Sequence, residues 1–346
     1  LTFPASYPLG HTHTHTHAHA HIYVRAHTST RIRTRTELLD SFRTDDELGV
    51  SMPATTPGVV RSLLWHRARL WVRGLHFTPR PPESWDPTVV RRVDACWAAA
   101  AGLAWVQPAR ATLFHARFAR EALNLGDPVR GCRALASEAA VLSAVGGATP
   151  RSTDAMERCR ALLKDIDDPL THAIVAIAEA TLHYFGGAYP AAQRWVVRAE
   201  AILEADVPGG GWELTSSQVL SSWSLAWMGD LHALRRRLPA LLRAARDRGD
   251  LLASATLSSG APTLAWLADD RPDLVLQHLD QSMALWTHER GFHSQHWMNL
   301  LARSNLELYQ GERQRAWARV DGTWDRMARS GLLRLQQTRL EALWLR

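Results

Sequence analysis

Residues 168–206 have the sequence DPLTHAIVAIAEATLHYFGGAYPAAQRWVVRAEAILEAD, and this stretch decides the fold that we predict for the chain. Apolar and small residues recur in each half at the i, i+3, i+4, i+7 spacing of one helix face. Gly186 and Gly187 separate the halves and can adopt the left-handed conformation that ends a helix, while Pro190 suits the first turn of the next helix. We therefore expect a hairpin of two amphipathic helices.

This periodicity assigns a side of the hairpin to each residue. In the first helix the core-facing residues are predicted to be Leu170, Ala173, Ile174, Ile177, Ala178, Thr181, Tyr184 and Phe185. In the second helix they are predicted to be Ala192, Trp195, Val196, Ala199, Ile202 and Leu203. The opposite, solvent-facing side of the second helix is predicted to carry Gln193, Arg194, Arg198, Glu200 and Glu204.

The same unit recurs through the second half of the chain. Turns that contain glycine or acidic residues stand at Gly186-Gly187, Gly229-Asp230, Asp269-Asp270 and Gly311-Glu312. They are about 40 residues apart, and helix-turn-helix repeats of that length are typical of α-solenoids. The sequence therefore predicts an all-α fold, a right-handed α-solenoid of helical hairpins with tetratricopeptide-like (TPR-like) repeats.

The later repeats also have predicted core positions. These are Leu231, Leu234, Leu238, Leu241, Leu242, Ala245, Leu276, Leu279, Met283, Trp286, Trp297, Leu300, Leu301, Ser304 and Leu308. Pro239 and Pro262 fall within helical runs, where proline is expected to kink or interrupt the helix. The final stretch LLRLQQTRLEALWLR leaves Leu340, Leu343 and Trp344 without a partner hairpin, so we expect the array to be truncated at its C-terminal end.

Helical periodicity begins well before the hairpin. Helices are predicted over 59–77, 88–106, 109–125, 127–145 and 152–166, with a proline-rich connector after the first of them. We therefore assign residues 59–346 to one TPR-like helical-repeat domain. Residues 1–58 differ, because they are rich in His, Arg and Thr and have no sustained apolar periodicity. We predict that this segment is disordered and that its alternating histidines bind metal only adventitiously.

Composition limits the class of protein. The chain has 346 residues, is 46% hydrophobic, and has no run near the roughly 20 apolar residues of a membrane-spanning helix. We predict a cytoplasmic protein without a membrane partner, and we interpret Cys96, Cys132 and Cys159 as reduced core residues. The net charge is +6, and the basic residues are almost all arginine, since Lys164 is the only lysine. Arginines spread over solvent-facing helix positions explain this charge without a nucleic-acid site.

Several segments resemble a known family. They are RVDACWAAAAGLAWV (92–106), the Arg-Gly-Asp-Leu sequence at 248–251, TLAWLADDRPDLVLQHLDQSMALW (263–286) and RGFHSQHWMNLLARSNLELYQGERQRAWARV (290–320). Together, over residues 59–346, they resemble the TPR-like C-terminal helical region of bacterial multidomain serine/threonine protein kinases that carry an AAA or STAND-type ATPase module. The resemblance implies a regulatory or partner-binding arm of a signalling protein, with kinase and ATPase chemistry located upstream.

The motifs of that upstream chemistry are missing from the sequence. A phosphate-binding loop requires a glycine-rich turn followed by lysine, but Lys164 lies in the helical sequence ALLKDIDD. The strand lysine, His-Arg-Asp and Asp-Phe-Gly motifs of kinases are also absent. We therefore predict that the chain is not an enzyme, and we assign it no catalytic, cofactor-binding or metal-binding residues and no cofactor.

Four weaker patterns have structural explanations that we favour. His288, His293 and His296 could share a metal, but they suit a turn followed by a helix start. The glycines of PGGGWELT (208–215) suit an inter-repeat turn better than an anion site. A dense group of arginines is interpreted as a solvated helix face: Arg235, Arg236, Arg237, Arg243, Arg246 and Arg248. Five acids at helix boundaries are interpreted as helix caps: Asp165, Asp167, Asp168, Asp269 and Asp270.

These observations favour a non-catalytic protein-interaction or regulatory helical-repeat module. Its expected partner is a protein or the upstream kinase and ATPase modules, and the sequence leaves a small-molecule ligand undetermined. Two alternatives stay open. A closed helical toroid with an all-α active site requires paired carboxylates in one pocket, and a helical-repeat nucleic-acid binder requires a continuous arginine-lined concave face.

Overall fold

The computed structural model describes residues 52–53, 55–207, 211–284, 286 and 291–346, and no described residue lies in a β-strand. The N-terminal helices are α3 (Thr56–Arg73), α4 (Pro87–Leu103), α5 (Pro108–Leu125), α6 (Pro128–Gly146) and α7 (Pro150–Leu163). The central ones are α8 (Pro169–Phe185), α9 (Tyr189–Asp206), α10 (Gly211–Trp227), α11 (Leu231–Asp247), α12 (Leu251–Leu257) and α13 (Leu264–Leu267). The last ones are α14 (Pro272–Ala284), α15 (Ser294–Tyr309), α16 (Arg313–Ser330) and α17 (Gln336–Leu345). Short 3-10 turns are η2 (Pro82–Ser84), η3 (Ala261–Thr263) and η4 (Leu332–Arg334).

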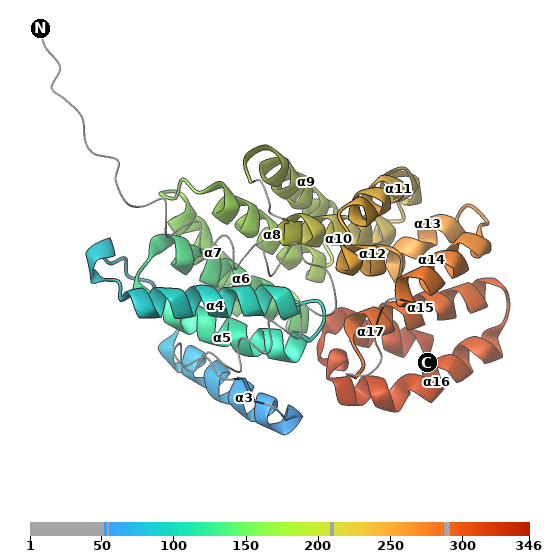
Figure 1. Cartoon of the computed structure of the whole chain (residues 1–346), viewed down its shortest axis with the longest axis horizontal. Helices are drawn as coiled ribbons and strands as arrows, with labels where there is room; N and C mark the ends of the chain where they lie inside the picture. Colours follow the sequence, from blue (N-terminus) through green and yellow to red (C-terminus); the bar gives the residue numbers. More distant parts are fainter. Residues whose placement is uncertain (1–51, 54, 208–210, 285, 287–290) are drawn as a thin grey trace, which may run out of the picture.

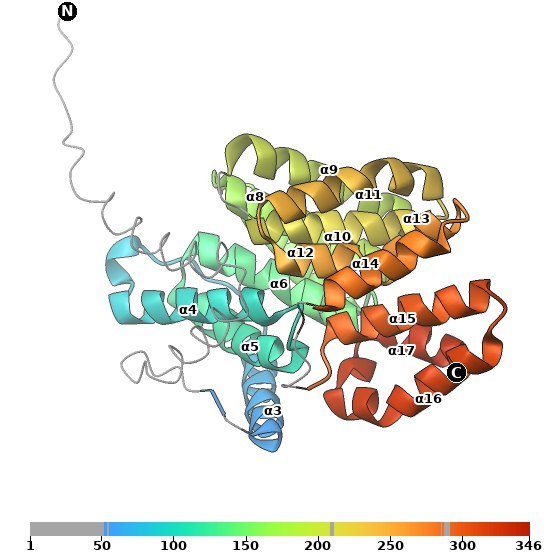
Figure 2. The same cartoon turned by 45° about the vertical axis from the view of Figure 1, so that its right-hand side comes forward.

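The helices form an all-α array in which consecutive helices pack as hairpins. The pairs α4–α5, α8–α9 and α15–α16 are in contact, and each hairpin also contacts the next, as in α6–α8 and α9–α10. In Figure 1 the array bends from α3 and α4 through α8 and α9 to α16, and Figure 2 shows α12 and α14 stacked against α15. This arrangement confirms the predicted all-α helical-repeat architecture.

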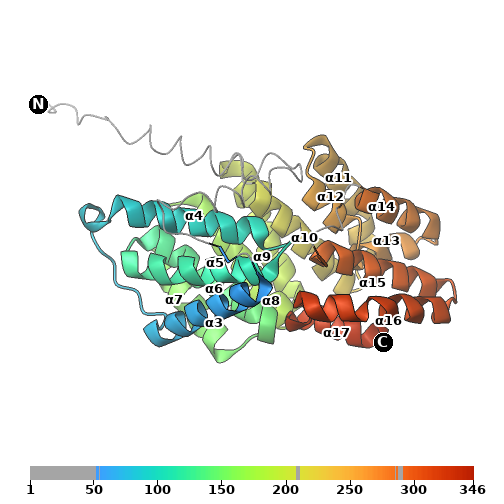
Figure 3. The ribbon, with the colours of Figure 1, turned by 60° about the horizontal axis from the view of Figure 1, so that its bottom comes forward.

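The curvature brings the end of the chain back toward its first half. Helix α17 contacts α6, although the two are almost 200 residues apart in sequence. Figure 3 shows α3, α4 and α5 at one end of the array and α15, α16 and α17 at the other, with α8 and α10 between them. The inner surfaces of distant repeats therefore face one another.

The helix boundaries follow from local sequence signals. Proline occupies one of the first two positions of α4 to α9, where its missing N–H would be unpaired in any case. Acidic caps supply the acceptor that the first turn requires, as when the Asp127 and Asp168 carboxylates accept from Val129 N and Thr171 N at 2.9 and 2.8 Å. Because these signals are local, the predicted helix boundaries lie within a few residues of the observed ones.

The hairpin at 168–206 forms as predicted, but its faces differ from the prediction. Helix α8 is also buried outside the predicted stripe, at Val175, Ala176 and Leu182. Within the stripe, four residues are only partly buried: Leu170, Ile177, Thr181 and Phe185. On α9, Trp195 is only partly buried, and the guanidinium of Arg198 lies 5.4 Å from its ring centre. Glu200 was predicted to face solvent and is buried, because Arg237 of α11 reaches over and donates to its carboxylate at 2.5 Å.

Two more expectations from periodicity are corrected on the later helices. Leu276 of α14 is 43% exposed, and Val275 takes its place in the core beside Leu279. Leu308 of α15 is also exposed. Helix α11 continues through Pro239, whereas Pro262 lies in η3, which separates α12 from α13. A single helix period cannot anticipate these differences, because the neighbouring repeat decides which side is covered.

Three buried apolar clusters form most of the core. One joins α4 to α8, one joins α8 to α15, and a smaller one joins α15 to α17. Cys96, Cys132 and Cys159 are buried free thiols, and Cys132 and Cys159 bring their sulfur atoms to 3.5 Å. The predicted low-complexity segment 1–58 lies mostly outside the described residues, and α3 begins at Thr56 within it.

Two glycines of the α15–α16 hairpin, one in its turn and one within α16, allow a test of the turn conformation. Gly311 has φ +81° and open space where a methyl group would lie, whereas Gly322 lies exposed within α16 and also has space for a methyl group. We expect Gly311→Ala to lower the free energy of unfolding by about 1–2 kcal/mol, because alanine is strained at positive φ. Gly322→Ala should raise it by about 0.5–1 kcal/mol. Urea denaturation measures both, and equal effects at the two sites would contradict the assigned turn.

Candidate functional site

The inner surface of the array forms a partly open cavity of about 320 Å³. Its lining comes from α4, α5, α6, α8, α10, η3, α15 and α17, with Leu335 just before α17, so hairpins along most of the array contribute. The three apolar clusters of the core each supply part of the wall, for example Trp97, Trp223 and Trp297. The cavity therefore lies where these clusters meet without filling the space between them.

Alanines on the N-terminal helices produce much of this space. Ala100, Ala101 and Ala104 follow one side of α4, and Ala140 and Ala144 follow one side of α6. A methyl side chain reaches only a short way from its helix, so alanine at these lining positions leaves space that larger residues would fill. Small residues at these positions thus set the width of the cavity.

Aromatic side chains form much of the remaining wall. They are Trp97, Trp105, Trp212, Trp223, Trp297 and Phe185. Several are held by specific contacts: Trp105 Nε1 donates to Ser216 Oγ at 3.2 Å and packs edge-on to Trp223 at 5.5 Å between ring centres. Trp97 packs against Phe118 at 5.0 Å. Such fixed rings give the cavity a defined shape.

Glu341 is the acidic residue of the lining. It lies on α17, is only 7% exposed, and accepts hydrogen bonds from Trp297 Nε1 at 3.1 Å and from Gln337 Nε2 at 2.7 Å. Burial raises the pKa of its carboxyl to about 6, although the two hydrogen bonds act in the opposite direction. At neutral pH the cavity therefore carries the negative charge of Glu341, and the two side chains that donate hydrogen bonds to this carboxylate are both uncharged.

His115 is the other titratable residue of the lining. Its Nε2 lies 3.1 Å from Ser137 Oγ, and burial lowers its pKa to about 4 despite the nearby Glu138 carboxylate. The imidazole is therefore neutral at pH 7. No lysine or arginine is among the lining residues, although the chain has 40 of them.

Contacts between distant segments hold the cavity together. Gln295 Nε2 at the start of α15 donates to the carbonyl of Trp105 at 3.0 Å, and Gly260 N donates to the carbonyl of Met298 at 3.0 Å. A ligand inside the cavity would touch both halves of the chain and so would add contacts between them.

Of the three histidines singled out in the sequence, His293 and His296 are not among the lining residues of this cavity. His293 caps α15, where its backbone N–H donates to His296 Nδ1 at 2.9 Å and its own Nδ1 accepts from Trp286 Nε1 at 3.3 Å. Within the described ranges, no group of three or more potential ligands is arranged to hold a metal ion. His288 lies outside the described residues.

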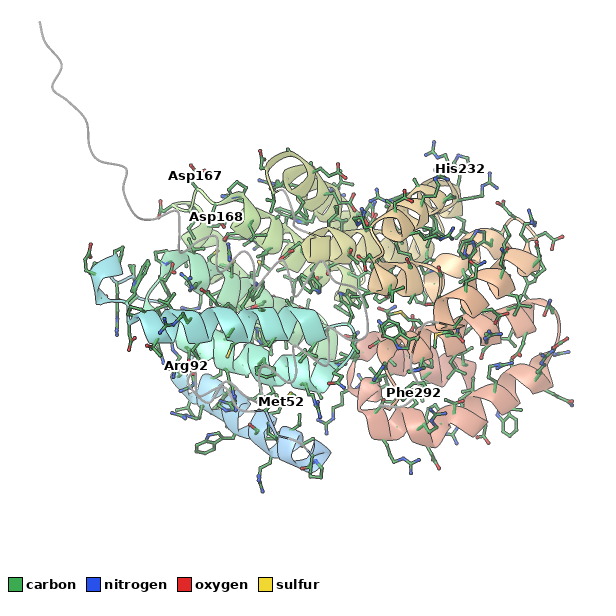
Figure 4. All side chains as sticks on the ribbon, in the orientation of Figure 1. Met52, Arg92, Asp167, Asp168, His232 and Phe292 are labelled. Atoms are coloured by element: carbon green, nitrogen blue, oxygen red, sulfur yellow. The ribbon has the colours of Figure 1, made fainter. Side chains whose placement is uncertain are left out.

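The remaining sequence patterns have structural roles. Gly211 begins α10, and residues 208–210 of the glycine run lie outside the described ranges. The arginines of α11 are mostly exposed, with Arg235 paired to Asp269 and Arg237 to Glu200. Asp167 and Asp168 lie together at the outer edge of the array, and Figure 4 also places His232 on another outer part of it. Phe292, in contrast, packs against the apolar cluster of α15 to α17. Asp168 caps α8 and pairs with Arg133 at 2.8 Å.

Sequence reasoning missed the cavity because its residues are scattered from Trp97 to Glu341. One signal was present: Trp212, Ser216, Leu220 and Trp223 share one side of α10, and all of them line the cavity. Of the tryptophans that line the cavity, Trp297 was predicted to be a core residue, a role that also suits a cavity wall.

Neither a protein-family model nor a curated protein sequence matches the chain. In the part of the chain that the structure describes, no helix is both long and apolar enough to cross a membrane. The cavity therefore provides the main basis for a functional proposal.

Proposed function

We propose that the chain is a non-catalytic regulatory helical-repeat module whose central cavity binds a small, largely apolar molecule. The observation that carries this proposal is the cavity of about 320 Å³ with walls of alanine and aromatic side chains. Ligand sites in proteins are typically concave and mostly apolar, with volumes from about 300 Å³ upward and a few polar groups that fix the ligand. Glu341 and the neutral His115 are such groups.

The regulatory part of the proposal follows from where the walls come from. Ligand contacts would link α4 and α6 to α15 and α17, and a ligand that binds only the folded array stabilises it. In an α-solenoid, such ligand binding changes the packing between repeats, and hence the outer surface that is available to a protein partner. The resemblance of residues 59–346 supports a kinase-linked and ATPase-linked bacterial signalling protein as the setting, with that protein's chemistry upstream.

A cavity-filling variant tests the proposal. The probe is the fluorophore 2-naphthol, which is uncharged at neutral pH and small enough for the cavity, titrated into the full chain while its emission is recorded. Wild-type protein should bind it, and Ala144→Phe should weaken binding by about tenfold or more, because the new ring occupies the cavity. Ala201→Phe is the matched control, since Ala201 is exposed on α9 and is not part of the lining.

Two results would overturn the proposed site. One is the absence of probe binding to the wild-type chain. The other is an equal loss of binding in Ala144→Phe and Ala201→Phe, which would place the probe elsewhere on the surface. Circular dichroism of each variant confirms that the helices are intact.

A further inference from the structure

The charge of the cavity restricts what it can bind. Glu341 is the sole charged residue among the lining residues at pH 7, since His115 is neutral there and no lysine or arginine takes part. Its two hydrogen-bond donors, Trp297 and Gln337, are uncharged, and no cationic side chain in the described residues lies within ion-pair distance of it. An anionic ligand would be repelled here, whereas a cation would gain the ion-pair partner that the carboxylate lacks.

The aromatic walls favour the same kind of ligand. The indole N–H groups of Trp105 and Trp297 are used by Ser216 and Glu341. Those of Trp97, Trp212 and Trp223 are covered by surrounding protein atoms. All five indoles therefore present ring carbons to the cavity, and aromatic rings attract cations when these lie within about 6 Å.

Three of the six hydroxyl side chains of the lining are already used as donors within the protein. Thr112, Ser137 and Thr181 donate to backbone carbonyls of their own helices at 2.7, 2.8 and 2.8 Å. Their protons are thus used within the protein, and a sugar would leave many of its own groups unpaired against alanine and tryptophan. The cavity suits a molecule with a single polar end.

We infer that the ligand is a lipophilic amine, with an apolar or aromatic body among the alanines and indoles and one protonated amino group against the Glu341 carboxylate. This inference rests on the proposed function, because it names the class of molecule that the same cavity takes. An apolar cavity of 150 Å³ holds benzene, so a volume of about 320 Å³ corresponds to a body of about a dozen non-hydrogen atoms. The raised pKa of Glu341 agrees with a carboxylate that lacks a cationic partner until the ligand arrives.

Three probes of one shape separate charge from apolar contact: 4-phenylbutylamine, 4-phenylbutan-1-ol and 4-phenylbutyrate. Isothermal titration calorimetry at about pH 8, where Glu341 is ionised, compares them on the wild-type chain. The amine should bind about tenfold or more tightly than the alcohol, and the carboxylate about tenfold or more weakly than the alcohol. This comparison requires no variant, so it does not depend on how a substitution affects folding.

Glu341→Gln then tests the residue itself. We expect this variant to lose most of the preference for the amine, about tenfold, while its affinity for the alcohol changes by less than about threefold. Glu204→Gln removes one negative charge from the exposed side of α9 and should leave all three affinities unchanged, which excludes a general charge effect.

The results distinguish this inference from the proposed function. If the alcohol binds as tightly as the amine, or if Glu341→Gln keeps the preference for the amine, the ligand class is wrong and the apolar cavity still stands as a binding site. If neither these probes nor 2-naphthol binds to the wild-type chain, both proposals are overturned.

Discussion

Replacing Phe118 with alanine should lower the free energy of unfolding by about 3–5 kcal/mol. Phe118 lies on α5, is 1% exposed, and packs against Trp97 within the N-terminal apolar cluster. The truncation removes the apolar contacts of the ring and leaves a void that rigidly packed helices fill only in part. Urea denaturation followed by circular dichroism measures the change.

Trp71→Ala is the matched control for this prediction. It also truncates an aromatic residue in a helix, but Trp71 is 69% exposed on α3, so the change should be within about 0.5 kcal/mol. Since repeats are stabilised mainly by their neighbours, Phe118→Ala should also accelerate amide exchange in α4 and α6 more than in α15 and α16. Uniform acceleration along the chain would instead indicate one cooperative core and would contradict the repeat description.

Local signals in the sequence were sufficient to predict the helices. Proline, acidic caps and glycine turns are short-range features, and the turns at Gly187, Gly229 and Gly311 have the positive φ that these positions were expected to need. The predicted core of α11 is also correct, because Leu234, Leu238, Leu242 and Ala245 form one buried stripe. Such features depend only on residues within the same helix or turn.

Contacts between repeats explain only part of the failed prediction of faces. Glu200 has the spacing of a solvent-facing residue, but Arg237 from the next hairpin covers it and pairs with it. Trp195 has the spacing of a core residue, yet it keeps part of its ring exposed beneath Arg198. The partner of Glu200 belongs to another hairpin, and helical periodicity carries no information about it. Arg198 lies one turn beyond Trp195 on the same helix, so that contact is local.

The cavity depends on contacts of still longer range. Helix α17 was predicted to leave Leu340, Leu343 and Trp344 without a partner, and all three are exposed. The other side of the same helix carries Thr338, Glu341 and Ala342, which are buried. Whether Glu341 is a surface acid or the charged group of a cavity depends on how the array curves, and no single repeat encodes that curvature.

Helix α3 is attached to the array by a buried ion pair, and breaking this pair is the second change that we expect to lower the free energy of unfolding strongly. Arg67 donates two hydrogen bonds to the Glu138 carboxylate of α6, at 2.6 and 2.9 Å. The Glu138 side chain is fully buried, while that of Arg67 is 25% exposed. Removing the arginine therefore leaves the carboxylate in the interior without its cation, which is the more costly way to break such a pair.

Arg67→Met should lower the free energy of unfolding by about 3–5 kcal/mol at neutral pH. The nearby His115, whose Nδ1 lies 3.7 Å from Glu138, is neutral in the wild-type chain, because burial above all, with a smaller contribution from Arg67 itself, lowers its pKa to about 4. Arg158→Met is the control, since it breaks an exposed pair with Asp154 and should change stability by less than about 0.5 kcal/mol. Urea denaturation compares the two variants.

The double variant Arg67→Met/Glu138→Leu determines whether the buried charge is the cause. Replacing both partners with apolar side chains leaves no unpaired charge, and such replacements are often neutral or stabilising, so most of the lost stability should return. If the double variant is as unstable as Arg67→Met alone, the loss arises from packing of the arginine stem and not from the carboxylate. If Arg67→Met is no worse than Arg158→Met, then apolar contacts of Val59, Leu63 and Leu70 suffice to hold α3 in place.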